Sequence, residues 1–274
     1  MKCDMDQILQ QALSPEQEPD RRLNRRILQR LEETEMRKNK KRIPAAACVA
    51  CATLLIGSMS VFAAWKYLSP DQVAEHVDEG GLSAAFQGED AVMVNETQEY
   101  GGYRITLLGI VSGKNLRQYP FEMNGEIKED RSYIVTAIEN ADGTPRPTVF
   151  DDAYGEDPFC VSPLIGGLNP WEYNVITMGG GYSEFIEDGI QYRLTECDNV
   201  EIFADRGLYL AVNDGAFFEN SAYHMDPNTG AITRNEAYQG VNALFQLPID
   251  VNKADPDATA AYIQEMESGN AGET

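Results

Sequence analysis

Residues 43–65 read IPAAACVACATLLIGSMSVFAAW and contain no charged side chain. As a helix this run would be about 34 Å long, enough to cross a hydrocarbon core of about 30 Å. Five basic residues precede it closely, namely Arg37, Lys38, Lys40, Lys41 and Arg42. Because basic residues are retained on the cytoplasmic side of a membrane, the sequence predicts one transmembrane helix over 43–65 in the cell membrane. The N-terminus is then cytoplasmic and the C-terminus extracytoplasmic.

Two alternatives to this signal anchor stay open. The run could be a buried Ala-rich helix of a protein without an anchor, although the basic flank argues against that. It could also be a cleaved signal peptide, since Val61-Phe62-Ala63 is an acceptable cleavage pattern. The region before its apolar run would span 42 residues, which is longer than usual. Trp65 and Tyr67 stand where an aromatic belt would lie at the outer interface, which favours the anchor.

Charge is unevenly distributed around this run. The 274-residue chain has 22 Lys+Arg and 44 Asp+Glu, a formal net charge of −22. Residues 1–42 have 11 basic and 8 acidic side chains, whereas residues 66–274 have 11 basic and 36 acidic ones, a net charge of −25. This acidity argues against nucleic-acid binding, which needs a basic face. Two distant histidines, His76 and His224, give little basis for a His-based zinc site or a Ser-His-Asp relay.

The segment before the apolar run, residues 1–42, is predicted to form two short cytoplasmic helices separated by Pro15 and Pro19. Their apolar positions at helical spacing include Ile8 and Leu9 in the first helix, and Leu23, Ile27 and Leu31 in the second. Helices this short bury little surface against each other, so their apolar stripes need a partner groove or the membrane surface. A tail that only sets topology and binds nothing is the third alternative.

The segment after the apolar run is predicted to be mainly β and sandwich-like, with short helices. Residues 66–90 form a helical lead-in, because Ser69-Pro70-Asp71-Gln72 is a capping box that opens a helix over 70–77. The β-rich domain spans 91–252. Its strands are expected at 91–95, 103–111, 131–138, 190–195, 199–203, 207–212 and 243–250, with hairpin turns at 99–102 and 141–143. The tail, 253–274, is expected to be a helix over 256–267 with a disordered end.

No catalytic motif is found in the sequence, so we expect no enzyme, no cofactor and no metal site. Gly179-Gly180-Gly181 lacks the Lys-Ser/Thr of a phosphate loop and is predicted to be a flexible loop. Asp226-Pro227-Asn228-Thr229-Gly230 departs from a calcium loop and is predicted to be a turn. Adjacent carboxylates such as Asp151 and Asp152 are expected by chance among 36 acidic residues and indicate solvated loops.

Cys160 and Cys197 are the two cysteines that follow residue 65. An oxidising outer side permits a disulfide between them but does not require one. A bridge and two free thiols are therefore left as alternatives.

Three stretches carry a resemblance: WKYLSPDQVA (65–74), NETQEYGGY (95–103) with TLLG (106–109), and CDNV (197–200) through ADRGLYL (204–210). They resemble an uncharacterised family of single-pass membrane proteins of Gram-positive anaerobes that share an outer domain of unknown function. Several members are labelled anti-sigma factors. The likeness covers roughly residues 64–256 and transfers no residue roles. It implies a sigma factor as partner of the cytoplasmic helices. The chain departs from zinc-type anti-sigma domains, because no His-x₃-Cys-x₂-Cys precedes the membrane run.

Two functions follow as hypotheses. In the first, the inner helices bind a sigma factor and the acidic outer domain senses an envelope signal. In the second, the outer domain is an envelope binding or adhesion module, and the inner segment only sets its orientation.

Overall fold

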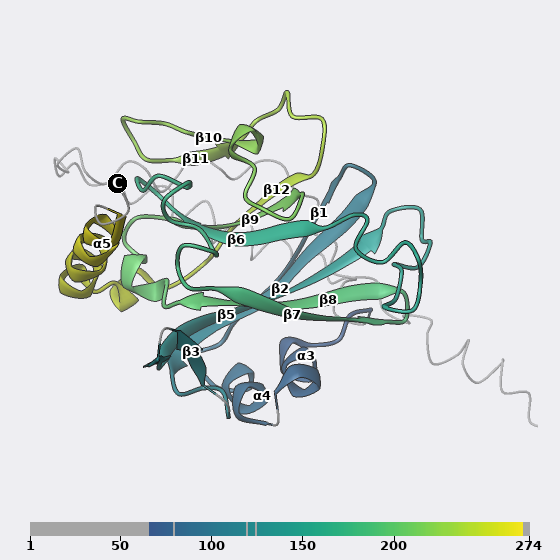
Figure 1. Ribbon diagram of the computed structural model, residues 1–274, viewed down its shortest axis with the longest axis horizontal. Helices are drawn as coiled ribbons and strands as arrows, with labels where there is room; N and C mark the ends of the chain where they lie inside the picture. The colour runs from purple at the N-terminus through teal and green to yellow at the C-terminus, as the bar shows by residue number, and fades with distance from the viewer. Residues whose placement is uncertain (1–65, 79, 119, 124, 271–274) are drawn as a thin grey trace, which may run out of the picture. The chain divides into compact units, whose positions relative to one another are not determined.

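The computed structural model describes residues 66–270 apart from 79, 119 and 124 (Figure 1). The predicted cytoplasmic segment, residues 1–42, and the predicted transmembrane helix, residues 43–65, lie outside these described residues. Within the described part of the chain, no helix is both long enough and apolar enough to cross a membrane.

A five-stranded antiparallel sheet forms the middle layer. Its strands in spatial order are β1 (Val92–Tyr100), β2 (Tyr103–Lys114), β5 (Asp130–Asn140), β8 (Ile190–Asp198) and β7 (Gly181–Glu187). Strands β1 and β2 are joined by Gly101 and Gly102, which both have a positive φ. Glycine adopts this conformation without a steric penalty, so the hairpin predicted at this turn is confirmed.

A three-stranded antiparallel sheet lies on one side of the first, as Figure 1 shows. Its strands in spatial order are β12 (Asn242–Gln246), β9 (Leu208–Asp214) and β6 (Phe159–Ile165). Two small ribbons complete the β structure, β3 (Phe121–Met123) with β4 (Glu126–Lys128) and β10 (Tyr223–Met225) with β11 (Ile232–Arg234). The prediction of a mainly β segment is therefore confirmed.

One core fills the space between the two sheets. It joins Ile105, Ile134 and Ile138 of the five-stranded sheet to Leu164 and Leu210 of the three-stranded sheet, all of them inaccessible to solvent. Successive residues of a strand point to opposite faces, and here alternate positions of β5 enter this core. The two sheets are therefore packed face to face.

A second core covers the other face of the five-stranded sheet. Helices α3 (Pro70–Val77) and α4 (Gly81–Phe86) lie there, on the side away from the three-stranded sheet (Figure 1). Val73, Leu82 and Phe86 of these helices pack with Tyr133 and Val135 of β5. Because β5 is buried on both faces, its sequence has no polar alternation. The helix predicted over 70–77 is confirmed, and α4 was not predicted.

The last helix, α5 (Pro256–Asn270), packs beside a short 3₁₀ turn at Glu201–Phe203. The Tyr262 hydroxyl donates to Asp198 Oδ2 at 3.0 Å, and the Thr259 hydroxyl donates to the Ile202 carbonyl at 2.8 Å. The predicted tail helix is thus confirmed, and it extends three residues beyond its predicted end at residue 267.

Two local predictions are wrong. The strand predicted over 199–203 is the 3₁₀ turn, because the Asn199 side chain accepts the Glu201 N–H at 2.9 Å and closes a turn. The hairpin predicted at 141–143 is absent, since β5 pairs with β2 and β8 while the chain continues into a long loop. Strand β6 was missed because Pro163 lies within it; β6 is an edge strand, where proline is tolerated.

Candidate functional site

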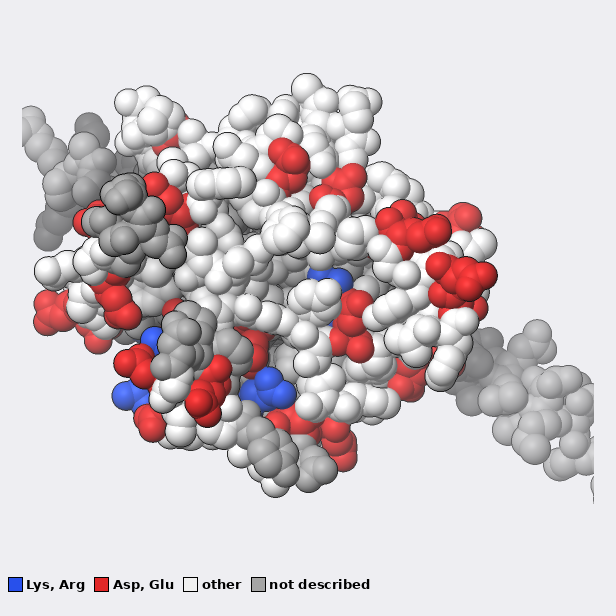
Figure 2. Space-filling model, in the orientation of Figure 1, with Lys and Arg blue, Asp and Glu red and all other residues white. Residues whose placement is uncertain are grey.

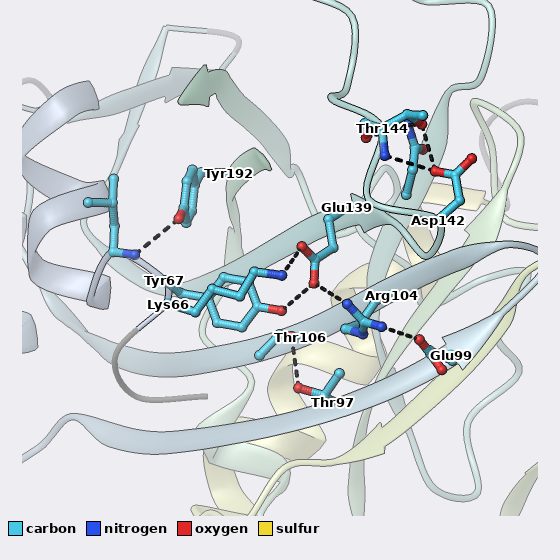
Figure 3. A network of polar contacts seen from close by, with 12 residues as sticks. Lys66, Tyr67, Thr97, Glu99, Arg104, Thr106, Glu139, Asp142, Thr144 and Tyr192 are labelled. Carbon is cyan, nitrogen blue, oxygen red and sulfur yellow. Dashed lines mark hydrogen bonds and ion pairs between the residues drawn. The ribbon is translucent and has the colours of Figure 1, made fainter. Parts of the chain in front are cut away.

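The described chain begins with four consecutive residues, 66–69, that are each held by a polar contact. Lys66 and Tyr67 contact Glu139 of β5, and the Leu68 N–H donates to the Tyr192 hydroxyl of β8 at 3.1 Å (Figure 3). The Ser69 N–H donates to Gln72 Oε1 at 2.9 Å, as the predicted capping box requires. The chain is therefore tied to the five-stranded sheet from its first described residue onward.

Glu139 is the centre of this arrangement, which we call the Glu139 junction (Lys66, Tyr67, Glu99, Arg104 and Glu139). Glu139 Oε2 forms an ion pair with Lys66 Nζ. Glu139 Oε1 accepts hydrogen bonds from the Tyr67 hydroxyl at 2.8 Å and from Arg104 at 2.9 Å. The Glu139 side chain is only 9% exposed, so the three donors replace most of the water that an ionised carboxylate needs.

Strand register explains why these charges meet. Arg104 of β2 lies directly opposite Glu139 of β5, and Glu99 of β1 lies directly opposite Arg104. Opposite positions in an antiparallel pair bring side chains on one face within contact distance. Arg104 therefore bridges both carboxylates, and its bond to Glu99 is 2.6 Å long (Figure 3). The Lys66 and Tyr67 side chains extend this row to the start of the described chain.

The junction is electrostatically balanced, with two cations and two carboxylates. Burial raises the pKa of the Glu139 carboxyl, but the hydrogen bonds from Lys66, Arg104 and Tyr67 lower it by more, so the net shift is downward from the ordinary value of 4.5. Burial, together with the charge and hydrogen bond of Glu139, raises the pKa of Tyr67 to about 12. At neutral pH Glu139 is therefore ionised, and Tyr67 keeps its proton and donates a hydrogen bond to it.

Helix α3 continues the attachment of this segment to the sheet. Its residues Val73 and Ala74 are fully buried in the second core. On its partly exposed side, His76 Nε2 lies 3.2 Å from a Glu187 carboxylate oxygen, and the His76 ring stacks on Phe185 at 4.3 Å. Polar contacts and apolar packing thus hold the lead-in on one face of the sheet.

A second charged cluster lies on the opposite face of the same sheet. Glu184 Oε2 of β7 accepts from Arg193 Nη2 at 2.6 Å and from Gln191 at 2.7 Å, both on β8. Arg193 also donates to the Phe159 carbonyl and lies 4.0 Å from the centre of the Tyr182 ring. Burial raises the pKa of Glu184, but Arg193 and the hydrogen bonds to the carboxylate lower it by more, so the pKa lies below its ordinary value of 4.5. The bonds from Arg193 and Gln191 to Glu184 are made within the β7–β8 hairpin and tie the edge strand to its neighbour. The Tyr154 hydroxyl, from the loop after β5, also donates to Glu184 Oε1 at 3.0 Å, and Arg193 links the hairpin to β6.

The predicted partner-binding residues Ile8, Leu9, Leu23, Ile27 and Leu31 lie outside the described residues. Of the two alternatives for the cysteines, the structure has free thiols at Cys160 and Cys197. Cys160 is on β6 and Cys197 on β8, in different sheets, and both are buried in the core between them. Burial raises the pKa of Cys160 to about 11 and that of Cys197 to about 12, so neither is a reactive thiolate at neutral pH.

Two further motifs can be compared with their predictions. Asp226 Oδ1 accepts the Asn228 N–H at 2.8 Å, and the Gly230 N–H donates to the Asp226 carbonyl at 2.8 Å, so the predicted turn is confirmed. The predicted loop at 179–181 ends where β7 begins at Gly181, and its flexibility stays a prediction. A Cβ on Gly180 would lie 2.3 Å from the Val175 carbonyl oxygen and 2.5 Å from that of Glu196, so this glycine allows two backbone segments to pack closely.

Among the residues that the structure describes, no three His, Cys, Asp or Glu side chains are grouped to hold a metal ion. The residues of the Glu139 junction were not identified as a site from the sequence. Tyr67 was noted only as an aromatic near the predicted anchor, and Glu139 lies one residue beyond the predicted strand 131–138. A lone acidic residue at a strand end carries no signal until the register places Arg104 beside it.

No protein family matches the chain, and no curated protein or solved structure shows significant similarity to it.

Proposed function

We propose that the protein is a single-pass membrane regulator that resembles anti-sigma factors. In this proposal two cytoplasmic helices in residues 1–42 bind a sigma factor, residues 43–65 cross the cell membrane, and the acidic segment from residue 66 onward senses an envelope signal. The protein has no catalytic role in this proposal. It transmits a change of conformation or position from the outer domain to the inner helices.

The Glu139 junction is the observation that carries this proposal. The predicted anchor ends at residue 65, and the next residue, Lys66, is already bonded to Glu139. Tyr67 and Leu68 are then bonded to β5 and β8. Because no free linker separates residue 66 from the sheet, a shift of the sheet is passed directly to the end of the predicted anchor. Such a stiff connection suits a signal transmitter.

The alternative function is an envelope binding or adhesion module whose inner segment only sets topology. Such a module works equally well on a flexible tether, so it has no need for a buried carboxylate that holds the first two described residues. The junction therefore favours the regulator over the adhesion module.

The test addresses the inner helices of the full-length protein in cells. Each large aliphatic side chain buried in a partner groove contributes about 1.5–3 kcal/mol. The triple change Leu23→Ala, Ile27→Ala and Leu31→Ala should therefore abolish co-purification of a sigma factor and raise transcription from its promoter. In the matched variant Gln replaces Arg21, Arg22, Arg25 and Arg26. It should change the salt dependence of sigma-factor binding more than the affinity itself.

Three outcomes separate the hypotheses. Raised promoter output in the triple-Ala strain, at normal protein level and membrane insertion, supports the regulator. Unchanged output contradicts it. A larger effect of the arginine changes would mean that the helices lie on anionic lipid, where each basic residue contributes about 1 kcal/mol.

A further inference from the structure

Two loops meet at the end of the five-stranded sheet where β2 begins and β5 ends. The loop 141–158 follows β5, and the loop 215–222 follows β9. The Gly215 N–H donates to the Pro158 carbonyl at 2.8 Å, which joins the two loops. Residue 103 pairs with residue 140 at the same end, one position from the Arg104–Glu139 pair. The loops therefore lie at the end of the five-stranded sheet that contains the Glu139 junction.

Each of these two loops exposes a phenylalanine. Phe150 is 94% exposed and Phe217 is 72% exposed. The turn that carries Phe150 is closed by Asp151 Oδ2, which accepts from the Thr148 N–H at 2.7 Å and from the Thr148 hydroxyl at 2.8 Å. The Phe217 carbonyl accepts from the Asn213 side chain at 3.0 Å. Both rings are thus presented to solvent by hydrogen-bonded turns.

The loop that carries Phe150 is rich in exposed carboxylates. Five acidic residues of loop 141–158 are exposed: Asp142, Asp151, Asp152, Glu156 and Asp157. The one basic residue of this loop, Arg146, is buried and donates to Asn140 and Gln191. Figure 2 shows red side chains and no blue ones at the right-hand end of the face drawn, where Figure 1 has the loops that follow β5.

We propose that this end of the domain binds a cationic amphipathic polypeptide. Phe150 and Phe217 would enter the apolar side of the ligand, and the loop carboxylates would pair with its lysines and arginines. The net charge of −25 over residues 66–274 attracts such a ligand over long range and repels an anionic lipid surface. A basic partner is therefore favoured over the bilayer.

The same loop leads directly to the Glu139 junction. Asn140 follows Glu139 in the chain, and its side chain donates to Thr144 and accepts from Arg146. A ligand that moves the loop would act on the residue next to Glu139. The role of this ligand as the envelope signal rests on the function proposed above, whereas its binding does not.

Binding can be measured with the full-length protein in nanodiscs of zwitterionic phosphatidylcholine and a fluorescent Lys/Leu amphipathic peptide. The double variant Phe150→Ala/Phe217→Ala should bind the peptide about tenfold more weakly, since buried aromatic anchors dominate such interfaces. The matched control Ile127→Ala/Trp171→Ala removes side chains that are 57% and 64% exposed on other segments, and it should bind normally. Equal losses in the two variants, or no loss in either, would overturn the proposal.

Charge is tested in the same way. Asp152→Asn/Glu156→Gln, which leaves the turn-closing Asp151 in place, should weaken peptide binding more than Glu122→Gln/Glu126→Gln, which removes two exposed charges from the β3–β4 ribbon. Equal effects would mean that the peptide responds only to net charge, which contradicts a specific surface. Circular dichroism of every variant checks that the fold is retained.

A photo-crosslinking residue at position 150 distinguishes the two candidate occupants. Adducts with the peptide support the proposal, and adducts with lipid that persist in the presence of peptide would replace it with membrane contact. Normal peptide binding with no change in promoter output on peptide addition to cells would contradict the role of this ligand as the envelope signal and leave the binding surface standing. Failure of the regulator itself is read separately, from unchanged output in the triple-Ala strain.

Discussion

Glu139 and Glu184 are carboxylates on opposite faces of the same sheet, and each is held by an arginine on a neighbouring strand. Glu184 is bonded to Arg193 and Gln191, at most nine positions away in its own hairpin, and to Tyr154 of the loop 141–158, 30 positions away. Glu139 is bonded to Lys66, 73 positions away, to Tyr67 and to Arg104. Similar chemistry therefore serves two purposes: Glu184 consolidates an edge hairpin and the loop beside it, and Glu139 attaches the segment that precedes α3 to the sheet.

Solvent access also differs between the two clusters. Arg193 and Glu184 have side chains that are 3% and 14% exposed. Lys66 and Arg104, which pair with Glu139, are 49% and 33% exposed. Water screens the second pair of contacts more strongly, so breaking the Glu184 cluster should cost more global stability. Breaking the Glu139 junction should release a segment while the rest of the fold persists.

The largest effect is expected for Arg193→Ala. This change leaves the Glu184 carboxylate buried without its cation, which typically costs about 3–5 kcal/mol. The midpoint of urea unfolding, followed by circular dichroism, should fall accordingly. A loss below about 1 kcal/mol would mean that Glu184 finds another partner or takes up a proton.

Glu139→Gln should have a smaller global effect, about 1–2 kcal/mol, because its charged partners are partly solvated. Its local effect should be larger: the amides of Leu68 and Val73 should exchange hydrogen faster than in the parent protein, while those of β5 and β8 stay protected. Glu126→Gln, at an exposed position of β4, is the control and should change neither. Uniformly faster exchange across the domain in the Glu139→Gln variant would contradict a local attachment.

A pH effect on the junction should follow from the lowered pKa of Glu139. Folding lowers the pKa of the Glu139 carboxyl, so this group stabilises the folded protein at any pH above its pKa in the unfolded chain, about 4.5. The stabilisation is lost as the pH falls through the lower pKa of the folded state. Exchange of the Leu68 amide, corrected for its intrinsic pH dependence, should therefore show a stable junction at pH 7 and opening only below about pH 4.5. Glu139→Gln should remove this dependence, and a dependence that survives would point to another group.

The smallest effect is expected at the two cysteines, which lie in the interior shared by both sheets. Native protein treated with iodoacetamide at neutral pH should remain unmodified at Cys160 and Cys197, because both thiols are buried with raised pKa values. Both should react after unfolding without prior reduction. A peptide linked through these two cysteines in a non-reducing digest would restore the disulfide alternative.

Several elements could be predicted because their signals are local. The Ser69–Gln72 capping box and the Gly101-Gly102 turn depend on residues within four positions of one another, and both predictions were confirmed. Strand β6 was missed because a strand tolerates Pro163 only at the edge of a sheet, and the sequence does not show which strand is at the edge. The 3₁₀ turn after Asn199 was predicted as a strand because the turn depends on which backbone groups lack a strand partner. Pattern alone contains neither fact.

The sequence by itself determined the division of charge, the helix that opens at Pro70 and the mainly β character after residue 90, because composition, caps and alternation act over short distances. Only the tertiary structure decided that Glu139 holds Lys66 and Tyr67, that Cys160 and Cys197 stay apart as thiols in different sheets, and that the loops carrying Phe150 and Phe217 meet. These outcomes depend on strand register and sheet order, which join residues far apart in the chain, and a one-residue change of register would turn each side chain to the other face.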